Sequence, residues 1–367
     1  MSFRDKLEEA YRGKTVLITG HTGFKGGWLA LWLESLGAKI IGFSWDVPTN
    51  PSFFQKTNLS GKITDLRGDV RDYNTVSKII HEHNPEIIFH LAAQPLVRAS
   101  YAAPRETIDA NVMGTANVLE AIRVSGGPAT CVCITSDKCY ENREWDYAYR
   151  ENDSLGGYDP YSASKGAAEI IIASYRRSFF SGDGCCALAS TRAGNIIGGG
   201  DWSVDRIVPD CIRSLHVGKP IELRNPSAIR PWQFILDPLY GYLLLAQKMQ
   251  EKPKEYSEAW NFGPDYRNNV DVCTLTQKMI AEWGSGTCEY PSSGPNTLHE
   301  ARFLKLDISK TVSRLGWRPQ YCIDTAVRNT VEWYKRCYSP KAKMDRFSLQ
   351  QIDHYMEHMD ASSGSPI

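Results

Sequence analysis

The sequence predicts a doubly wound α/β fold, in which a parallel sheet carries helices on both faces. In its first half, short apolar runs rich in β-branched residues alternate with amphipathic stretches, and a glycine-rich loop follows the first run. Parallel strands need crossover connections, and these place successive strands in one sheet. Ligands of such sheets bind beyond the carboxyl ends of the strands, so we expect functional residues there.

The expected strands are short and the expected helices are longer. Strands are predicted over residues 14–20, 38–44, 86–93, 129–136 and 185–192. The first helix is expected to end at Gly37. Its apolar face is spaced by three and four residues and consists of Trp28, Leu29, Trp32, Leu33 and Leu36. Further helices are expected over 72–83, 105–124 and 158–180.

After Arg192 the chain becomes loop-rich, and this change predicts a smaller C-terminal α/β domain for substrate. The first domain is expected over residues 1–191, with a returning segment over about 229–257. Segments 192–228 and 258–355 are then expected to form the smaller domain. The polar end of the chain, 356–367, is expected to be a flexible tail.

Composition narrows the class of partner. The chain has 367 residues, of which 42% are hydrophobic, and its 42 basic and 42 acidic residues cancel, so nothing indicates a nucleic-acid partner. The N-terminus has no apolar signal region, and no apolar run approaches the roughly 20 residues that span a bilayer. We therefore expect a cytoplasmic protein. The ten cysteines match no zinc-binding spacing, so no metal site is expected.

The glycine-rich loop between the first strand and the first helix is the first candidate binding site. Gly20 permits a tight turn, Gly23 lets the backbone approach a pyrophosphate, and Gly26 allows close packing of helix on sheet. The amino end of the helix would face the negative charge. An ordinary glycine-rich turn is the alternative, but the order strand, loop, helix favours a dinucleotide site.

The end of the second strand indicates which dinucleotide is bound. A carboxylate there binds the adenosine ribose, whereas an arginine favours a 2′-phosphate. The sequence places Ser44 and Asp46 at this point with no arginine nearby, so NAD is expected rather than NADP. Asp69 and Val70 follow the third strand and could hold the adenine edge, although Asp69 could equally be a turn residue.

Tyr161 and Lys165 are the candidate proton-transfer pair. Their spacing of four residues at the start of a helix places both side chains on one face. A free tyrosine has a pKa of about 10, and a neighbouring cation together with a nicotinamide ring favours the phenolate. Such a tyrosine can accept a proton from a sugar hydroxyl while a hydride leaves the same carbon.

These motifs resemble the extended, nucleotide-sugar-modifying branch of the short-chain dehydrogenases/reductases. The resemblance also covers HLAAQ (90–94), NVMGTANVLEA (111–121) and RFLKLDISKTVSRLGWRP (302–319). It implies a Rossmann domain that binds NAD and a smaller domain that binds a nucleotide sugar. It implies that Ser136 hydrogen-bonds the reacting hydroxyl and that Asn111 supports the catalytic lysine through water.

The resemblance also implies two sets of binding residues. The expected cofactor contacts are Gly20, Thr22, Gly23, Phe24, Gly26, Ser44, Asp69, Val70, Leu91, Ala92, Ala93, Asn111, Tyr161 and Lys165. The expected substrate contacts are Gln94, Asn195, Arg213, Arg230 and Arg302. Arginine suits a diphosphate because its planar fork is bidentate, although each arginine could equally form a surface ion pair.

The segment TSDK (135–138) indicates a dehydratase. A 4,6-dehydratase oxidises the sugar at C4, which makes the C5 proton acidic; a base then removes that proton while an acid protonates the 6-hydroxyl. The stored hydride returns to C6, so NAD is regenerated. Asp137 suits the acid, whereas Lys138 stands where many dehydratases have glutamate. TSDK, HTGFKG, GNIIGGGDW and RPWQFILDPL are similar to strings of the CDP-glucose 4,6-dehydratases, which implies CDP-glucose as substrate.

Several alternatives stay open. Lys138 is hypothesised to remove the C5 proton or to stabilise the enolate, and a structural ion pair with Asp137 is the alternative. A 4-epimerase, or a dehydratase of a UDP-, dTDP- or GDP-linked sugar, is the nearest rival, and a non-catalytic NAD-sensing or scaffold protein is another. The resemblance further implies a homodimer through a four-helix bundle, with an apolar seam from Ile108, Val112, Ile170 and Ile171.

Overall fold

The computed structural model describes residues 2–126, 130–265, 268–290 and 303–363. At its centre is a seven-stranded sheet in the order β11-β6-β5-β4-β1-β2-β3, with every neighbouring pair parallel. Its strands are β1 (Thr15–Thr19), β2 (Lys39–Ser44), β3 (Thr64–Arg67), β4 (Ile87–His90), β5 (Thr130–Ile134), β6 (Ala187–Ala193) and β11 (Ala259–Phe262). The predicted parallel α/β sheet is confirmed.

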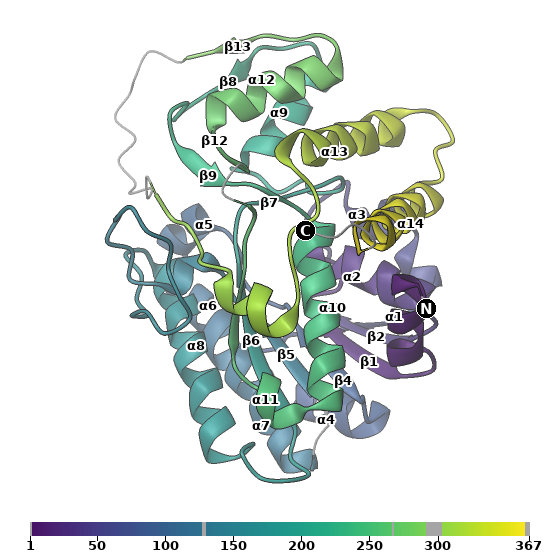
Figure 1. The fold of residues 1–367 in the computed structure, drawn as a ribbon, viewed down its shortest axis with the longest axis vertical. Helices are drawn as coiled ribbons and strands as arrows, with labels where there is room; N and C mark the ends of the chain where they lie inside the picture. The colour runs from purple at the N-terminus through teal and green to yellow at the C-terminus, as the bar shows by residue number, and fades with distance from the viewer. Residues whose placement is uncertain (1, 127–129, 266–267, 291–302, 364–367) are drawn as a thin grey trace.

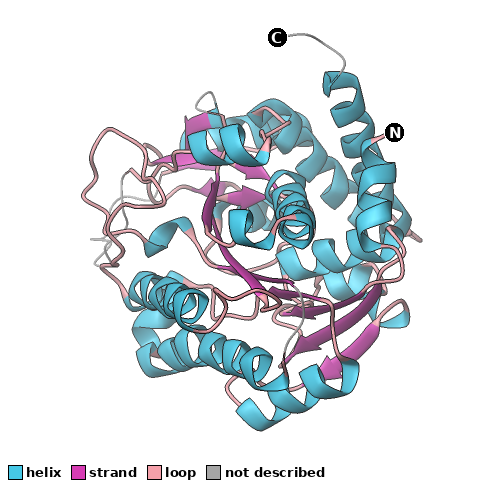
Figure 2. Cartoon of the chain, turned by 60° about the horizontal axis from the view of Figure 1, so that its bottom comes forward, coloured by secondary structure: helices cyan, strands magenta, loops and turns pink. Residues whose placement is uncertain are grey.

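Helices cover both faces of this sheet (Figure 2). Alternate residues of β1 explain why: Val16 and Ile18 belong to one buried apolar cluster, and Leu17 belongs to another. One face carries α4 (Tyr73–His83), α7 (Gly114–Ser125) and α8 (Pro160–Ser178). The other carries α2 (Phe24–Ser35) and α10 (Leu236–Glu251), with α1 (Phe3–Tyr11) packed on α10.

The helix predicted over 105–124 is interrupted. It consists of α6 (Pro104–Ile108), a π-helical turn over Asp109–Met113, and α7, with α5 (Val97–Ala102) before it. A π-helical turn inside a helix frequently marks a functional site, because it re-aims the side chains that it carries. Here the turn carries Asn111.

A smaller lobe lies above the carboxyl ends of the strands (Figure 1). It contains β7 (Ile196–Ile197) paired with β10 (Gln233–Phe234), β9 (Ile229–Pro231) paired with β12 (Asn269–Asp271), and β8 (Ile221–Glu222) paired with β13 (Cys288–Glu289). Its helices are α9 (Ile207–His216), α12 (Val272–Trp283) and α13 (Ile323–Tyr338). The remaining short helices are α3 (Phe53–Lys56) and α11 (Pro253–Tyr256).

The returning segment is longer than the predicted 229–257. β9 belongs to the smaller lobe, whereas α10 packs on the central sheet and β11 forms its edge. In β11, Trp260 and Phe262 are fully buried and pair in register with Thr191 and Ala193 of β6. The sequence boundary at residue 257 therefore cut off the strand that completes the sheet.

The flexible tail predicted over 356–367 is instead mostly helix. α14 (Met344–Ser363) contains residues 356–363 and packs against α1 and α2. Ile352, Tyr355, Met356 and Met359 are buried at a spacing of three and four residues, so the last segment has an amphipathic face that was missed. Residues 364–367 lie outside the described residues.

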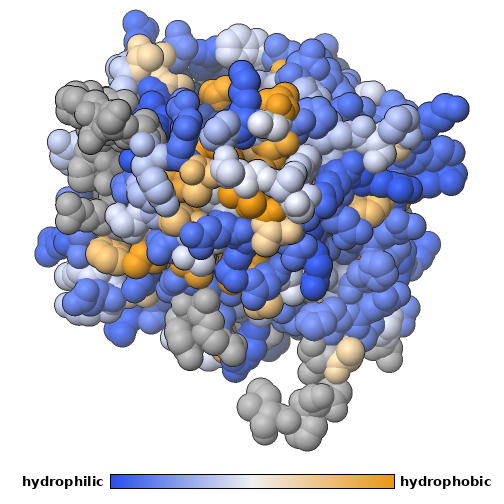
Figure 3. Space-filling model, turned by 90° about the horizontal axis from the view of Figure 1, so that it is seen from above, coloured by the Kyte–Doolittle hydropathy of each residue, from blue (hydrophilic) through white to orange (hydrophobic). Residues whose placement is uncertain are grey.

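The surface seen from above is mostly hydrophilic, with apolar residues gathered in separate patches near its middle (Figure 3). Within the described ranges, no helix is both long and apolar enough to cross a membrane.

Candidate active site

The glycine-rich loop joins β1 to α2 where the strand order reverses between β1 and β4. Gly20 has a φ of +79°, and a Cβ there would lie 2.8 Å from the Ala92 backbone nitrogen. A Cβ on Gly26 would overlap the Gly20 carbonyl. Gly23 caps α2 without a side-chain hydrogen bond. The loop therefore leaves an open cradle at a helix amino end, which fits a pyrophosphate.

The expected cofactor residues after β4 lie against this cradle. The Leu91 N–H donates to the Thr19 carbonyl at 3.0 Å, and the Ala92 N–H donates to the Thr19 hydroxyl at 3.2 Å. Ala93 follows directly. His90 bridges the hydroxyls of Thr19 (2.7 Å) and Thr115 (3.1 Å), and burial lowers its pKa to about 3. The neutral imidazole thus ties β4 to the loop.

The end of β2 is held by a histidine that the sequence motif did not single out. The Ser44 hydroxyl lies 2.9 Å from His21 Nδ1, and His21 Nε2 lies 2.9 Å from the Asp65 carboxylate. The Thr22 hydroxyl donates to the Asp46 carbonyl at 2.6 Å. Ser44 and Thr22 therefore both lie at the loop, and the nearest carboxylate on β3 is engaged by His21.

Two arginines lie closer to this region than the sequence suggested. Arg67 of β3 is the register partner of Ser44 and donates to the Asp65 carboxylate at 2.8 Å. The Arg71 guanidinium lies 5.0 Å from the Trp45 ring, but it also donates to the Asp69 carboxylate at 2.5 and 2.8 Å. The Val70 carbonyl accepts a hydrogen bond from Asn117. No arginine directly follows β2 in the sequence, but in the folded chain two arginines lie beside its end. Each of them is paired with an aspartate.

The catalytic candidates of β5 lie on a 3₁₀ turn, Asp137–Cys139, directly after the strand. Ser136 caps this turn, and its hydroxyl donates to Asp137 Oδ1 at 2.9 Å. Ser136 and Asp137 are buried, and Lys138 is half-buried. The described ion pairs include none between Asp137 and Lys138, so the structural pairing considered for Lys138 is not seen.

Tyr161 and Lys165 lie on the first turns of α8, which Asp159 caps. The Ser136 hydroxyl lies near the Tyr161 phenol and opposes the rise of its pKa. Burial raises the pKa of Tyr161 to about 12 and lowers that of Lys165 to about 8. The nearby positive charge that opposes the rise is that of Arg206, whereas the sequence argument assigned this effect to Lys165.

These groups border one cavity of about 660 Å³. Ser136, Asp137, Lys138 and Tyr161 line it, as do Phe24 of the phosphate loop and Asn195 and Arg230 of the smaller lobe. The cavity lies between the sheet and the smaller lobe, where ligands of doubly wound sheets bind. The structure thus brings four of the five predicted catalytic residues and two of the predicted substrate residues to one cavity, whereas Lys165, buried one turn after Tyr161, does not line it.

Two predicted substrate residues are engaged elsewhere. The Gln94 amide bonds the Leu96 backbone and the Thr107 hydroxyl, and so it shapes its own loop. Arg213 pairs with Asp210 and the Trp202 carbonyl. Neither is among the described residues that line the active-site cavity, so their contact with substrate stays a prediction. Arg302 lies outside the described residues.

Asn111 supports this region from the π-helical turn. Its amide nitrogen donates to the Ser164 hydroxyl at 2.8 Å, and its oxygen accepts the Gln94 N–H at 2.8 Å. Ser164 precedes Lys165 on α8. The expected support of the lysine through water stays a prediction, while the direct bonds join Asn111 to the turn of α8 that carries the lysine.

Sequence reasoning missed three residues of the cavity wall. Lys25 lies in the phosphate loop and faces Asp137; burial and the nearby charges of Arg206 and Lys165 lower its pKa to about 7. Arg206 pairs with Asp201 at 2.8 Å. Gly194 is required because a Cβ there would overlap the Asp137 carboxylate. Lys25 and Gly194 stood inside the quoted strings HTGFKG and GNIIGGGDW, which were the signals available.

Metal binding has no support in the described part of the chain, where no group of three or more His, Cys, Asp or Glu residues could hold an ion. The ten cysteines are unpaired, and six of them are buried.

Comparison with known proteins identifies the family. The model of the GDP-mannose 4,6-dehydratase family matches residues 17–330. The CDP-glucose 4,6-dehydratase of Salmonella typhimurium is 46% identical over 329 residues, which cover 89% of this chain and 91% of that protein. The dTDP-glucose 4,6-dehydratase of Xanthomonas campestris is 26% identical over 341 residues, 87% of this chain and 93% of that protein.

Solved structures share the fold. A UDP-glucose 4-epimerase of Thermotoga maritima aligns with a TM-score of 0.75 at 20% identity, covering 89% of this chain and all of that chain. The dTDP-glucose 4,6-dehydratase of Bacillus anthracis, in complex with NAD, aligns at 0.74 and 20%, covering 88% and 97%. The resemblance seen in the motifs is thus confirmed, and this chain belongs to the GDP-mannose 4,6-dehydratase family of extended short-chain dehydrogenases/reductases.

Proposed function

We propose that this protein catalyses the NAD-dependent 4,6-dehydration of CDP-glucose to CDP-4-keto-6-deoxyglucose. The observation that carries the proposal is that Ser136, Asp137, Lys138 and Tyr161 all border one cavity. An epimerase needs the serine and the tyrosine, whereas an acid and a base beside them suit the loss of water. The 46% identity to a CDP-glucose 4,6-dehydratase supports the choice of nucleotide.

NAD fits the phosphate loop. The positions of Gly20 and Gly26 admit no Cβ, and the uncapped amino end of α2 offers backbone N–H groups to a pyrophosphate. When bound, NAD would provide the acceptor for the C4 hydride and the donor of the same hydride to C6. Ser44, Thr22 and the segment Leu91–Ala93 surround the loop and would hold the rest of the dinucleotide.

Oxidation at C4 requires a base for the 4-hydroxyl proton. Tyr161 accepts this proton, and Ser136, which lies near the phenol and lines the same cavity, orients the same hydroxyl. Because burial holds the phenol neutral, with its pKa at about 12, the phenol needs added positive charge before it can act as a base at neutral pH. Arg206 lies close enough to supply part of it.

Loss of water requires an acid at the 6-hydroxyl and a base at C5. Asp137 is the acid, because its buried carboxyl lines the cavity and lies beside the serine. Lys138 removes the C5 proton or holds the negative oxygen of the enolate. Asn195 and Arg230 line the same cavity from the smaller lobe and would bind the sugar and the diphosphate.

Two further expectations belong to this proposal. The chain forms a homodimer through α8 and the α6–α7 segment, and it works in the cytoplasm. The exposed side chains of Ile108 and Ile170 support the first, since both lie on these helices.

A mass measurement tests the function. The purified protein is incubated with NAD and, in separate reactions, CDP-, UDP- and dTDP-glucose and GDP-mannose. We expect CDP-glucose to lose one water with no net NADH. Loss of water from another sugar alone would overturn the nucleotide, and an isomerised sugar of unchanged mass would make the protein an epimerase.

A further inference from the structure

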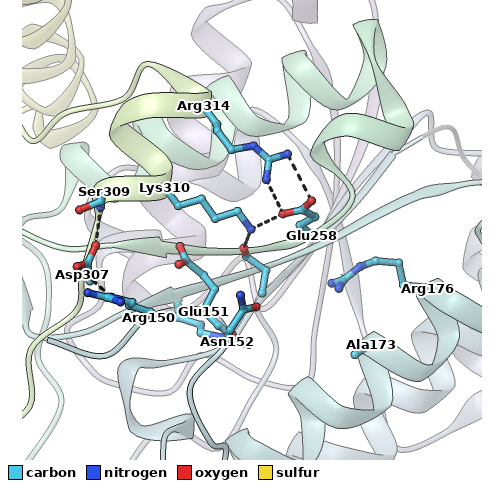
Figure 4. Close-up of a pocket in the computed structure, with 12 residues that line it drawn as sticks. Arg150, Glu151, Asn152, Ala173, Arg176, Glu258, Asp307, Ser309, Lys310 and Arg314 are labelled. Atoms are coloured by element: carbon cyan, nitrogen blue, oxygen red, sulfur yellow. Dashed lines mark hydrogen bonds and ion pairs between the residues drawn. The ribbon is translucent and has the colours of Figure 1, made fainter.

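A second cavity, of about 710 Å³, lies against α8 and the edge strand β11. It shares no lining residue with the active-site cavity. Its walls come from residues 150–152, the second half of α8, β6, the start of β11 and residues 307–314 (Figure 4). Its volume lies in the range of sites for small molecules.

Charge on the cavity wall is unequal. Five cations line it: Arg150, Arg176, Arg192, Lys310 and Arg314. Three carboxylates line it: Glu151, Glu258 and Asp307. Lys310 and Arg314 share Glu258, as Figure 4 shows, and Arg150 lies 3.7 Å from Asp307. Glu169 pairs with Arg192 behind the wall, and even with this fourth carboxylate the cations remain in excess.

Arg176 is the least satisfied of these cations. Its Nε donates to the Leu188 carbonyl at 2.7 Å. Its Nη2 is buried without a hydrogen-bond partner, and the described residues place no carboxylate within ion-pair distance of it. A buried guanidinium nitrogen without an acceptor is costly, and an oxyanion removes that cost. In Figure 4 its head points from α8 toward Glu258 and Asn152.

Arg192 adds a second donor in the same wall. It is 3% exposed, and its Nε is buried without a partner. Its other nitrogens bond Glu169 at 2.8 Å and the Tyr140 hydroxyl at 2.7 Å. Two guanidinium groups with unused donors beside one cavity match the several acceptor oxygens of a phosphate better than the two of a carboxylate.

We propose that this cavity binds a phosphate group, either free phosphate or the phosphate of a small monoester, between Arg176 and Arg192. The remaining volume holds the organic part of an ester. The site is also connected to the catalytic turn. Arg192 donates to the Tyr140 hydroxyl, and its ion-pair partner Glu169 accepts from the Thr135 hydroxyl at 2.5 Å. The Arg192–Glu169 pair therefore contacts both ends of the segment that carries Ser136 and Asp137. The proposal does not depend on the sugar that the active site takes.

Thermal unfolding in inorganic phosphate, against chloride at equal ionic strength, tests the site. We expect a rise in Tm of about 5 °C at phosphate a hundredfold above its Kd. Arg176→Gln should abolish the rise. Arg177→Gln, which removes the same charge from the exposed next residue, should keep it, and so should Arg230→Gln in the active-site cavity.

Ala173→Glu is a second test that removes no existing contact. Ala173 lines the cavity one turn before Arg176, so a glutamate there supplies the missing acceptor. We expect this variant to be more stable than the wild type without phosphate and insensitive to phosphate. A rise in Tm that persists in Arg176→Gln and Ala173→Glu, or that disappears only in Arg230→Gln, would overturn the proposal.

Titration calorimetry with inorganic phosphate and with ribose 5-phosphate distinguishes free phosphate from a phosphate monoester as the ligand. Tighter binding of the ester supports a monoester ligand, and binding of inorganic phosphate alone supports free phosphate. If neither probe gives a binding heat that is lost in Arg176→Gln, the proposed site is contradicted.

Discussion

At the scale of single residues, the reaction depends on how the wall of one cavity places a few polar groups. Ser136 donates to Asp137 and lies near Tyr161, so one hydroxyl lies beside both the proposed acid for C6 and the proposed base for C4. Lys138 is the next residue on the same turn. Three consecutive residues at the end of β5 can therefore act on neighbouring carbons of one sugar.

Lys138→Ala is expected to separate the two halves of the reaction. Hydride transfer from C4 needs Tyr161 and Ser136, which this change leaves in place, whereas loss of water should slow by about 10²–10⁴-fold. NADH absorbance should then accumulate in the presence of CDP-glucose while the mass of the sugar shows no loss of water. Lys39→Ala, an exposed lysine on β2, is the control. Normal dehydration by Lys138→Ala would exclude this residue from the elimination.

Gly194→Ala is expected to displace the acid. A Cβ at this position would overlap the Asp137 carboxylate, so the carboxylate must move, and a shift of about 1 Å can cost about 10²-fold in rate. The kcat for dehydration should fall while NAD binding is unchanged. Gly263→Ala, whose Cβ would meet its neighbours at 3.4 Å, is the matched control. Equal dehydration rates for the two variants would show that the reaction does not depend on the present position of the Asp137 carboxylate.

At the scale of elements, α8 carries the tyrosine and the lysine into a dry interior. Burial lowers the pKa of Lys165 to about 8 from its ordinary 10.5. Between these two values the unfolded chain binds more protons than the folded chain, so this group makes the free energy of unfolding rise with pH across that window. Below pH 8 the buried charge destabilises the fold in full.

Lys165→Met is therefore expected to be more stable than the wild type at pH 7, by on the order of 3 kcal/mol at most. The difference should shrink as the pH rises from 8 toward 10.5, because the wild-type lysine becomes neutral in both states. Urea unfolding at several pH values measures it, with Lys39→Met as the exposed control. A difference that stays constant with pH would mean that the ammonium is not desolvated.

The sequence was informative where a local pattern decides the structure. β1, the glycine loop and α2 were predictable because a continuous apolar run, three glycines and an apolar face follow one another. Long-range pairing was not predictable: β11 was assigned to the wrong domain because only its pairing with β6 shows where it belongs. α14 was missed because polar residues hid its buried face.

The site was predictable to a similar extent. Motif residues at strand ends were found, since the sheet brings such ends together. The present partners of Gln94 and Arg213 could not be predicted, because a side chain's partners depend on three-dimensional neighbours, here Thr107 and Asp210. Arg206 carries no local signal, and Gly194 stood inside the quoted string GNIIGGGDW without being singled out, because the importance of both lies in what they contact.

At the scale of the whole molecule, α8 and the α6–α7 segment lie side by side and expose apolar side chains. Ile108 is 46% exposed, Met113 is 51% and Ile170 is 57%. Ile171, expected in the same seam, packs instead against the cluster beneath the sheet. The exposed part of the seam is therefore narrower than the sequence suggested, and it shifts toward Met113.

We expect the double variant Ile108→Asp, Ile170→Asp to sediment as a single chain of 41.2 kDa, and the wild type to sediment at twice that mass. Charges placed in an apolar interface are left desolvated and unpaired, which prevents association. Val217→Asp, at a position 62% exposed in the smaller lobe, should behave as the wild type. Analytical ultracentrifugation measures this, and a monomeric wild type would remove the predicted dimer.

Deuterium at C4 of CDP-glucose tests the proposed dehydration most directly. The proposal requires the hydride of C4 to return to C6 of the same sugar, while the proton lost from C5 exchanges with solvent. Mass spectrometry and NMR should therefore find the deuterium at C6 of a product that has lost one water. Deuterium recovered at C4 of an isomerised sugar, or lost to solvent, would contradict the proposal.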